Sequence, residues 1–160
     1  MYQTTGSKHN PLHVLHVWCV LYRLLQYINA QPSCFFRGIE EACENYQVLD
    51  SADRKVTNDD TPLLCDDTLG PAWFRFQGDA GIQMPTSCIS SRRCGTHSTG
   101  WLNGAHPEEH ESNVTRHVCF SWSICCHFHV NIQVQNCSGY YIYYIDGTPS
   151  PCYLRFYGTD

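Results

Sequence analysis

The adjacent cysteines Cys125 and Cys126 are the strongest single constraint on how this chain can fold. Neighbouring Cα atoms lie about 3.8 Å apart across a trans peptide bond, whereas disulfide-bonded Cα atoms usually lie about 4.4–6.8 Å apart. In an extended segment the two side chains also point to opposite faces. We therefore expect Cys125 and Cys126 to form disulfides with two different partners in distant segments. Residues 119–157 would then be the hub of a disulfide framework.

A strand is predicted directly after this pair. Every even position from Phe128 to Val134 is apolar, and every odd position from His127 to Gln135 is polar. Side chains of a strand alternate between faces, so this pattern predicts a strand with one dry face and one wet face.

The residues that follow predict a meander. Ser138-Gly139 supplies a turn, and the aromatic and β-branched run at 140–145 is typical of a returning strand. Asp146-Gly147 turns the chain again, and residues 153–157 can form a third strand. The predicted fold class is mainly β: a small disulfide-rich domain with an antiparallel meander, hairpins and long irregular loops.

A second hairpin is predicted upstream. Residues 72–77 and 82–84 have strand composition, and the glycine-bounded segment 78–81 between them is typical of a turn. Residues 51–60 indicate an exposed loop, and residues 94–117 indicate a long polar connection.

The first thirty residues resemble a signal peptide that is cleaved after Ala30. A basic residue precedes an apolar run, although Arg23 and two histidines interrupt that run, so an uncleaved amphipathic helix or a misread gene start are the alternatives. Cleavage would remove Cys19 from the eleven cysteines and leave an even ten. An even number of cysteines in a short secreted chain indicates a disulfide framework.

The charge balance argues against two classes of partner. The chain has ten Lys and Arg against fifteen Asp and Glu, and cleavage would remove Lys8 and Arg23, leaving a net charge of −7. An acidic chain with no basic cluster indicates neither nucleic-acid binding nor binding to anionic membranes. We also expect no membrane insertion of the mature domain, because the leader is short and carries a central arginine.

Catalytic and metal-binding patterns are weak. His127 and His129 share one strand face and could ligate zinc together with Cys125 or Cys126. However, the chain has no Cys-x-x-Cys pair, and oxidised cysteines do not bind metal. No glycine-rich phosphate loop is present, and a run of glutamates at 108–111 is more typical of a solvated loop. We therefore expect no catalytic residues, no metal and no cofactor.

Two N-glycosylation sequons are present, Asn113-Val-Thr115 and Asn136-Cys-Ser138. Asn113 lies in the polar connection and is expected to be accessible. Asn136 sits beside a cysteine at a strand end, where folding competes with glycosylation.

Ordered motifs from Cys43 to Asp160 resemble a known family. They are Cys43-x-Asn45-Tyr46-x-Val48-Leu49-Asp50, Trp73-Phe-Arg75-Phe76-x-Gly78-x-x-Gly81, Met84-Pro85-x-x-Cys88, Trp101-Leu-Asn-Gly-x-His106-Pro107, Trp122-x-x-Cys125-Cys126 and Gly139-Tyr140-Tyr141-Ile-Tyr143. The family is the ten-cysteine domain shared by uromodulin, the pancreatic secretory granule membrane major glycoprotein 2 and oncoprotein-induced transcript 3. Together with the leader pattern, the resemblance divides the chain into a signal peptide (1–30), a short extension (31–42) and a uromodulin-like cysteine-rich domain (43–160).

The resemblance implies an extracellular disulfide-bonded module of a type found in mosaic glycoproteins with EGF-like and zona-pellucida modules. Members present glycans to bacterial adhesins or form extracellular polymers. This chain departs from the family at Tyr157, where a tenth cysteine is expected, and at Ala105, which breaks a family sequon. The missing cysteine would leave its partner without a mate, so either Cys34 compensates or one mature cysteine stays free. No zona-pellucida module follows Asp160, so polymerisation is not expected.

We therefore predict a secreted, non-enzymatic, disulfide-stabilised glycoprotein module that binds an extracellular protein or a glycan-binding partner. The predicted disulfide cysteines are Cys34, Cys43, Cys65, Cys88, Cys94, Cys119, Cys125, Cys126, Cys137 and Cys152. The candidate binding loop lies within residues 95–117, because function is often carried by loops on a rigid scaffold. Its candidate residues are Trp101, Asn103, His106 and His110, with Trp101 as a core anchor. The alternative function is a metal-binding or hydrolytic protein that uses the His/Cys cluster.

Overall fold

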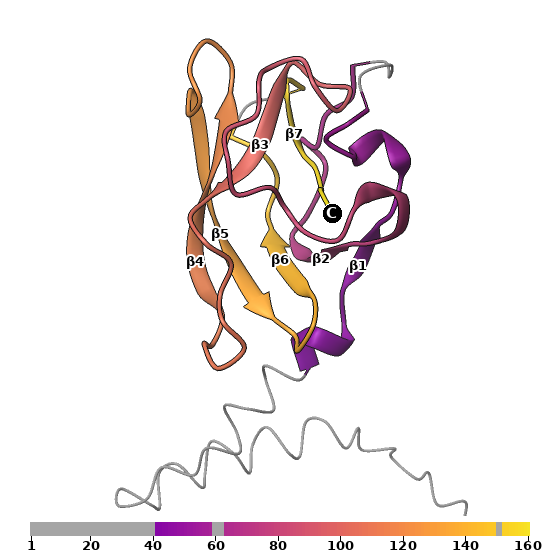
Figure 1. Ribbon diagram of the computed structural model, residues 1–160, viewed down its shortest axis with the longest axis vertical. Coiled ribbons are helices and arrows are strands. Elements are labelled where there is room, and N and C mark those ends of the chain that lie inside the picture. Colours follow the sequence, from indigo (N-terminus) through magenta and orange to yellow (C-terminus); the bar gives the residue numbers. More distant parts are fainter. Residues whose placement is uncertain (1–40, 59–62, 150–151) are drawn as a thin grey trace, which may run out of the picture. The chain divides into compact units, whose positions relative to one another are not determined.

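The computed structural model describes residues 41–58, 63–149 and 152–160, which form a mainly β domain with little helix (Figure 1). The elements are β1 (Gln47–Leu49), the 3₁₀ helix η1 (Ala52–Arg54), β2 (Ala72–Phe76), the 3₁₀ helix η2 (Gly78–Ala80), β3 (Ser98–Asn103), β4 (Val114–Ser121), β5 (Phe128–Asn136), β6 (Tyr141–Ile145) and β7 (Leu154–Phe156). The predicted signal peptide at 1–30, Cys34 and most of the predicted extension at 31–42 lie outside the described residues.

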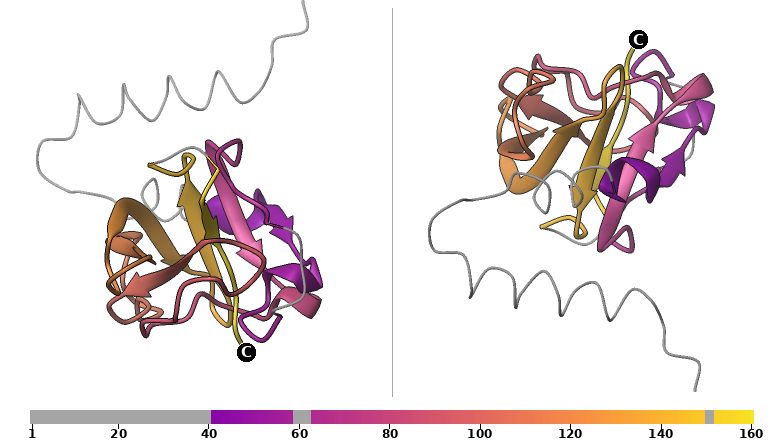
Figure 2. Two further views of the ribbon diagram at one scale, coloured as in Figure 1. Left: turned by 90° about the horizontal axis from the view of Figure 1, so that it is seen from above. Right: turned by 90° about the horizontal axis from the view of Figure 1, so that it is seen from below.

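The strands form one mixed sheet in the order β1-β2-β6-β5-β4-β3-β7. The four inner pairings are antiparallel, whereas β1 pairs with β2 and β3 pairs with β7 in parallel. The views from above and below in Figure 2 show the sheet curled around its interior. The predicted mainly β class is confirmed, but a purely antiparallel meander is only partly correct.

The β5–β6 hairpin follows the sequence prediction closely. Ile132 and Val134 are buried, whereas His129 and Asn131 on the alternate positions are exposed. The two strands pair in antiparallel register, and Ser138 and Gly139 turn the chain with φ of 53° and 120°. These left-handed backbone conformations are the ones that tight turns require.

Two predicted pairings are wrong. Residues 153–157 do contain β7, but β7 pairs with β3 and not with β6. The upstream hairpin does not form either: β2 pairs with β1 and β6, while Gln83 forms an isolated bridge with Thr159. Both errors have the same cause, because local composition indicates strands but not which distant strand completes their hydrogen bonds.

The predicted polar connection at 94–117 is also wrong, since it contains β3 and the start of β4. Small and polar residues open β3, yet Ser98 and Thr99 are fully buried. Gly100 permits a close approach, because a Cβ at this position would lie 2.7 Å from the Phe120 ring. The strand is therefore buried by tight packing against β4, a feature that hydrophobic periodicity does not detect.

The apolar core fills the concave side of the sheet. Phe74 and Phe76 of β2, Phe120 of β4 and Phe156 of β7 are at most 1% exposed. The rings of Phe120 and Phe156 meet edge to face, with centroids 5.3 Å apart. Burying one such side chain contributes about 1.5–3 kcal/mol, so these rings are a main source of stability.

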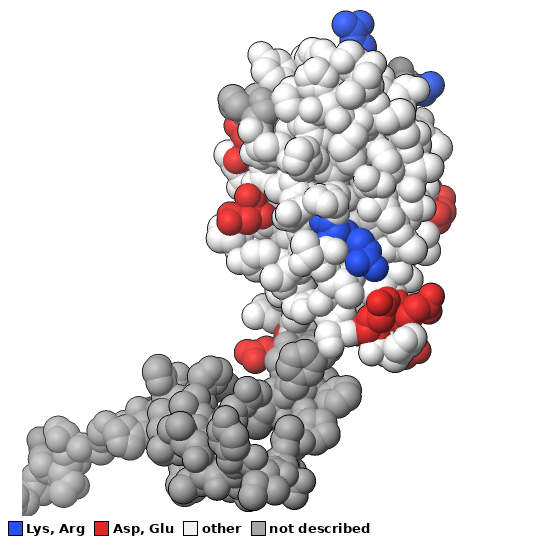
Figure 3. Space-filling view, turned by 90° about the vertical axis from the view of Figure 1, so that its left-hand side faces the viewer, with Lys and Arg blue, Asp and Glu red and all other residues white. Residues whose placement is uncertain are grey.

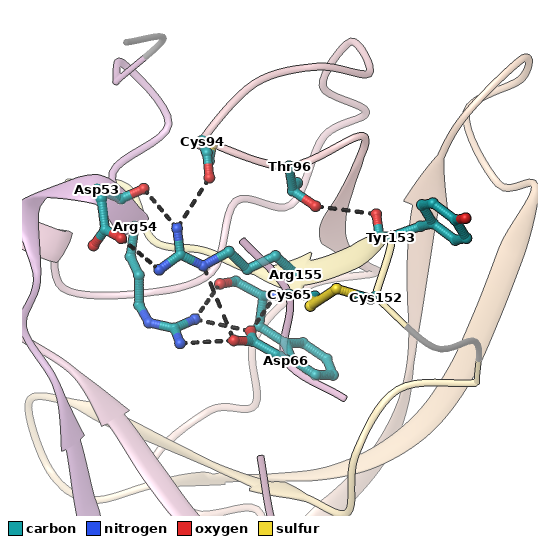
Figure 4. A network of polar contacts seen from close by, with 10 residues as sticks. Asp53, Arg54, Cys65, Asp66, Cys94, Thr96, Cys152, Tyr153 and Arg155 are labelled. Atoms are coloured by element: carbon teal, nitrogen blue, oxygen red, sulfur yellow. Dashed lines mark hydrogen bonds and ion pairs between the residues drawn. A yellow bond between two sulfur atoms is a disulfide. The ribbon is translucent and has the colours of Figure 1, made fainter. Parts of the chain in front are cut away.

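A largely buried polar cluster connects η1, which follows the edge strand β1, with Arg155 on the other edge strand, β7 (Figure 4). The Val56 N–H donates to the Gly158 carbonyl (3.0 Å), which links the segment after β1 to the segment after β7. Arg54 donates to both carboxylate oxygens of Asp66, at 2.8 and 2.7 Å, and Arg155 donates to Asp53 at 2.8 Å. We call these four charged residues, Asp53, Arg54, Asp66 and Arg155, the polar seam.

Candidate binding surface

Four disulfides connect the described residues. They join Cys43 to Cys137, Cys65 to Cys152, Cys88 to Cys125 and Cys119 to Cys126. The prediction that the adjacent cysteines bond to different partners is confirmed. The prediction that both partners lie in distant segments is wrong for Cys126, whose partner is only seven residues away on β4.

These two bridges hold the loop between β4 and β5, residues 122–126, which we call the stapled loop. Trp101 on β3 donates its indole N–H to the Cys125 carbonyl at 2.8 Å, and the Ser121 hydroxyl donates to the same carbonyl at 3.1 Å. Trp101 is half-buried and so anchors the loop from the neighbouring strand. Its indole N–H is therefore already used inside the domain and is not available to a binding partner.

Trp122 of the stapled loop forms an aromatic group with side chains from two other segments. Trp122 is 42% exposed and Tyr153 is 47% exposed, with their ring centroids 5.9 Å apart. His97 contacts both rings, at 5.7 and 5.5 Å between centroids. The sequence prediction missed this group, because its members come from three separate segments of the chain.

The outer face of β3, β4 and β5 carries four exposed polar side chains, none of which is Lys, Arg, Asp or Glu. The strand register places Asn103 opposite His117, and His117 opposite Asn131. His129 is also exposed, and its ring lies 6.1 Å from that of His117. The side of the molecule that carries β4 and β5 is mostly uncharged, with one basic group near its middle and acidic groups toward its margins (Figure 3). We call Asn103, His117, His129 and Asn131 the neutral face.

The structure does not bring the four predicted loop residues together into one site. Trp101 and Asn103 lie on β3, whereas His110 lies exposed in the following turn. His106 is half-buried: its ring stacks on Tyr141 at 4.2 Å, and its Nε2 lies 2.8 Å from the Tyr143 hydroxyl. Burial, helped by the charge of Arg116, lowers the pKa of His106 to about 4, so this ring is neutral at physiological pH.

The two sequons differ in their surroundings. Asn113 is exposed just before β4, and its side-chain amide donates to Gln133 Oε1 at 2.9 Å. Asn136 is half-buried, and its side-chain amide donates to the Pro107 carbonyl at 3.0 Å. The geometry therefore leaves Asn113 more open to modification than Asn136.

A second aromatic group covers the outer face of β2 and β6. The guanidinium of Arg75 lies 3.8 Å from the ring centroid of Tyr140 and donates to the Tyr46 hydroxyl at 2.8 Å. On the same face the rings of Trp73 and Tyr144 meet edge to face at 5.5 Å. Cation–π and edge-to-face contacts of this kind are favourable even at exposed sites.

The alternative zinc site, formed by His127, His129 and Cys125 or Cys126, has no thiolate ligand in this structure. Cys125 and Cys126 are both disulfide-bonded, and a cysteine in a disulfide does not ligate zinc. Within the part of the chain that the structure describes, no group of three or more His, Cys, Asp or Glu side chains is placed to hold a metal ion. The same residues also contain no helix that is long and apolar enough to cross a membrane.

Comparison with known proteins identifies the family of this chain. The family profile of the uromodulin-like cysteine-rich domain matches residues 74–158, which is more than half of the chain. The chain belongs to the uromodulin-like domain family. It is similar to the pancreatic secretory granule membrane major glycoprotein GP2 of Canis lupus familiaris, with 42% identity over 123 residues, 75% of this chain and 23% of the relative.

Two further relatives support the assignment. The human GP2 glycoprotein is 35% identical over 118 residues, which are 72% of this chain and 22% of the relative. Mouse uromodulin is 37% identical over 123 residues, which are 76% of this chain and 18% of the relative. This chain therefore spans less than a quarter of the length of the relatives that it matches.

The family resemblance predicts a cysteine at the position where this chain has Tyr157. The structure places Tyr157 fully buried near Cys94, and burial together with this neighbour raises the pKa of the Tyr157 hydroxyl. Cys94 is buried too and lies outside the four bridges, although the sequence analysis predicted it in a disulfide. The compensating role of Cys34 stays a prediction, because Cys34 is outside the described residues.

Proposed function

We propose that this uromodulin-like domain is a secreted, non-enzymatic glycoprotein module that binds an extracellular protein or a glycan through its neutral face. The observation that carries the proposal is this face itself: exposed asparagine and histidine side chains, which can donate and accept hydrogen bonds, stand in register across three paired strands. An uncharged ligand surface with hydroxyl or amide groups would match such a face without leaving a buried charge unpaired.

The scaffold under the neutral face favours binding over catalysis. The core residues Leu102, Val118 and Ile132 lie beneath it, and the Cys119–Cys126 bridge closes its upper end. A face fixed by strand pairing and a crosslink loses little entropy when a partner binds, which raises affinity. Catalysis would instead need groups whose pKa values are tuned against each other within one site.

Secretion and glycosylation are part of the same proposal. Disulfide frameworks form in oxidising compartments, and the matched relatives are named as secretory granule membrane glycoproteins. We expect glycan at Asn113, which is exposed, and lower occupancy at Asn136, which is half-buried and bonded to Pro107. The mass of protein secreted from mammalian cells should fall equally in Asn113→Gln and Thr115→Ala, since either change destroys the sequon.

Binding is tested with the secreted full-length chain, biotinylated and applied to arrays of extracellular proteins and of glycans. We expect His117→Ala/Asn131→Ala to weaken a detected interaction by about tenfold, because two hydrogen bonds of about 0.5–1.5 kcal/mol each are removed. The matched control is Ile82→Ala, which truncates another exposed side chain away from this face and should bind normally. Equal binding by the double variant and the wild type would exclude the neutral face as the contact surface.

A further inference from the structure

The aromatic pair on the outer face, half-buried Trp73 and exposed Tyr144, lies near the Asn113 sequon, which indicates what covers it. The Tyr144 side chain is 36% exposed on β6, and its ring meets that of Trp73 on β2 at 5.5 Å. Both side chains stand on the outer face, opposite to Phe74 and Tyr143, which are in the core. The pair is therefore an aromatic surface that the described residues bury only in part.

The strand register connects this pair to the sequon at Asn113. Thr115 on β4 is opposite Gln133 on β5, Gln133 is opposite Tyr144 on β6, and Tyr144 is opposite Trp73 on β2. Neighbouring strands lie about 4.7–4.9 Å apart, so this row places Tyr144 one strand spacing from Gln133. The Asn113 side-chain nitrogen, to which a glycan would be attached, is 2.9 Å from Gln133 Oε1.

The existing hydrogen bond is compatible with attachment of a sugar. An asparagine amide nitrogen carries two hydrogens, and an N-glycosidic bond replaces only one of them. The remaining N–H can still donate to Gln133, which would hold the glycan stem against β5. From that position, next to Asn131 on the same face of β5, the glycan can extend toward β6.

The chemistry of the row fits a sugar. Thr115, Gln133, Tyr144 and Trp73 carry no formal charge, and N-acetylglucosamine, the first sugar of an N-linked glycan, is also uncharged. A pyranose ring has an apolar C–H face that can lie against the negative face of an aromatic ring, while its acetamide and hydroxyl groups can bond to an amide side chain. Gln133 and the aromatic pair supply both kinds of contact side by side.

We infer that the first sugars of an N-linked glycan at Asn113 lie across β5 and pack on Tyr144 and Trp73. The domain's own glycan is then the occupant of the aromatic pair, and it is held in a fixed direction across β5 toward β6. This inference rests on the glycosylation of Asn113 proposed above.

The test uses full-length protein secreted from mammalian cells that make only high-mannose glycans, with Ser138→Ala present to remove the second sequon without changing Asn136. An endoglycosidase trims the glycan to a single N-acetylglucosamine, and the intact mass shows whether that sugar is attached. The proton resonance of its acetyl methyl group then reports on packing. We expect an upfield shift from the position of the free sugar, because the methyl group lies over an aromatic ring.

Three variants decide the outcome. Tyr144→Thr should return the acetyl methyl resonance toward the free-sugar position, whereas Tyr144→Phe should keep the shift because the ring remains. Tyr153→Thr, which removes a tyrosine that is more exposed (47% against 36%) and lies beside the stapled loop, should leave the shift unchanged. If the sugar is attached but its acetyl methyl resonance is not shifted, or if the shift persists in Tyr144→Thr, the sugar does not pack on Tyr144. Glycosylation of Asn113 would still stand. A mass without any sugar would overturn both, while binding through the neutral face is measured separately.

Discussion

The stapled loop and the polar seam are both held in place by side-chain bonds, but the bonds are of different kinds. The loop at 122–126 is held by the bridges Cys88–Cys125 and Cys119–Cys126. The seam is held by ion pairs among side chains that are mostly buried, with Asp66 only 2% exposed. A disulfide acts mainly by restricting the unfolded chain, whereas a buried ion pair acts only in the folded state and only while both partners are present.

This difference predicts which conditions and substitutions destabilise each region. The stapled loop should respond to reductant and be largely indifferent to single charge changes. The seam should respond to acid and to loss of one charge, because an unmatched buried charge is much more costly than an absent pair. Predictions that separate the two regions follow, from the largest expected effect to the smallest.

Asp66→Ala should have the largest effect. Asp66 accepts hydrogen bonds from Arg54 and from the Phe156 N–H, so its removal leaves a buried guanidinium without its carboxylate. We expect the free energy of unfolding to fall by about 3–5 kcal/mol, as measured by urea denaturation. The control Asp67→Ala removes the adjacent exposed carboxylate and should change stability by less than about 0.5 kcal/mol. Similar losses in both variants would show that the seam does not depend on this pairing.

Removal of each stapling bridge should have the next largest effect, and the two bridges should differ. Cys88 and Cys125 are separated by 37 residues, but Cys119 and Cys126 by only 7. Loop entropy therefore predicts a loss of about 4 kcal/mol for Cys88→Ala/Cys125→Ala and about 2 kcal/mol for Cys119→Ala/Cys126→Ala. Urea denaturation of both double variants measures the difference, and a larger loss from the shorter loop would contradict the entropic account.

Acid should weaken the domain in two steps, neither of which involves the disulfides. Burial lowers the pKa of His106 from 6.5 to about 4, so the unfolded chain binds a proton first as the pH falls. Stability should therefore decrease between pH 6.5 and about 4, and urea midpoints across this range should show a smaller decrease in His106→Gln than in the control His110→Gln. If the urea midpoints of the wild type, His106→Gln and His110→Gln depend on pH in the same way, protonation of His106 does not cause the loss of stability.

The second acid step belongs to the seam. Burial alone would raise the pKa of Asp53, but hydrogen bonds from Ser51 and Arg155 outweigh it and hold this pKa below its ordinary value of 3.8. A carboxylate with a lowered pKa stabilises the fold above that ordinary value and loses this contribution as the pH falls further. We expect Asp53→Asn to flatten the decrease in the urea midpoint below about pH 4. An unchanged decrease would place the acid sensitivity elsewhere.

Trp101→Phe should have the smallest effect. The change removes the indole donor to the Cys125 carbonyl but keeps an aromatic ring on β3. One hydrogen bond contributes about 0.5–1.5 kcal/mol, so urea denaturation should show a loss of this size. The amide resonances of residues 122–126 should also shift, because the loop loses its anchor. Trp122→Phe, on the exposed side of the loop, serves as the control, and equal effects of the two changes would remove the anchoring role of Trp101.

The sequence by itself determined the features that depend on local pattern. The alternation from Phe128 to Val134 predicted β5, and Ser138-Gly139 predicted its turn, since both signals lie within a few consecutive residues. The adjacency of Cys125 and Cys126 was enough to predict two different disulfide partners, because geometry forbids most alternatives. The ordered motifs were also enough to predict the uromodulin-like family.

Only the tertiary structure decided how these elements are combined. β3 lies in a segment whose polar composition does not predict a strand. It is buried because Gly100 lets β4 and the Phe120 ring approach closely. The neutral face exists because β3, β4 and β5 are placed in register, and the row from Thr115 to Trp73 exists for the same reason. The polar seam joins Asp66 to Arg54 and to the Phe156 N–H, groups that come from separate parts of the chain. A pairing between distant strands leaves no local periodicity, so its physical cause, the burial of one shared core, can be read only in the folded chain.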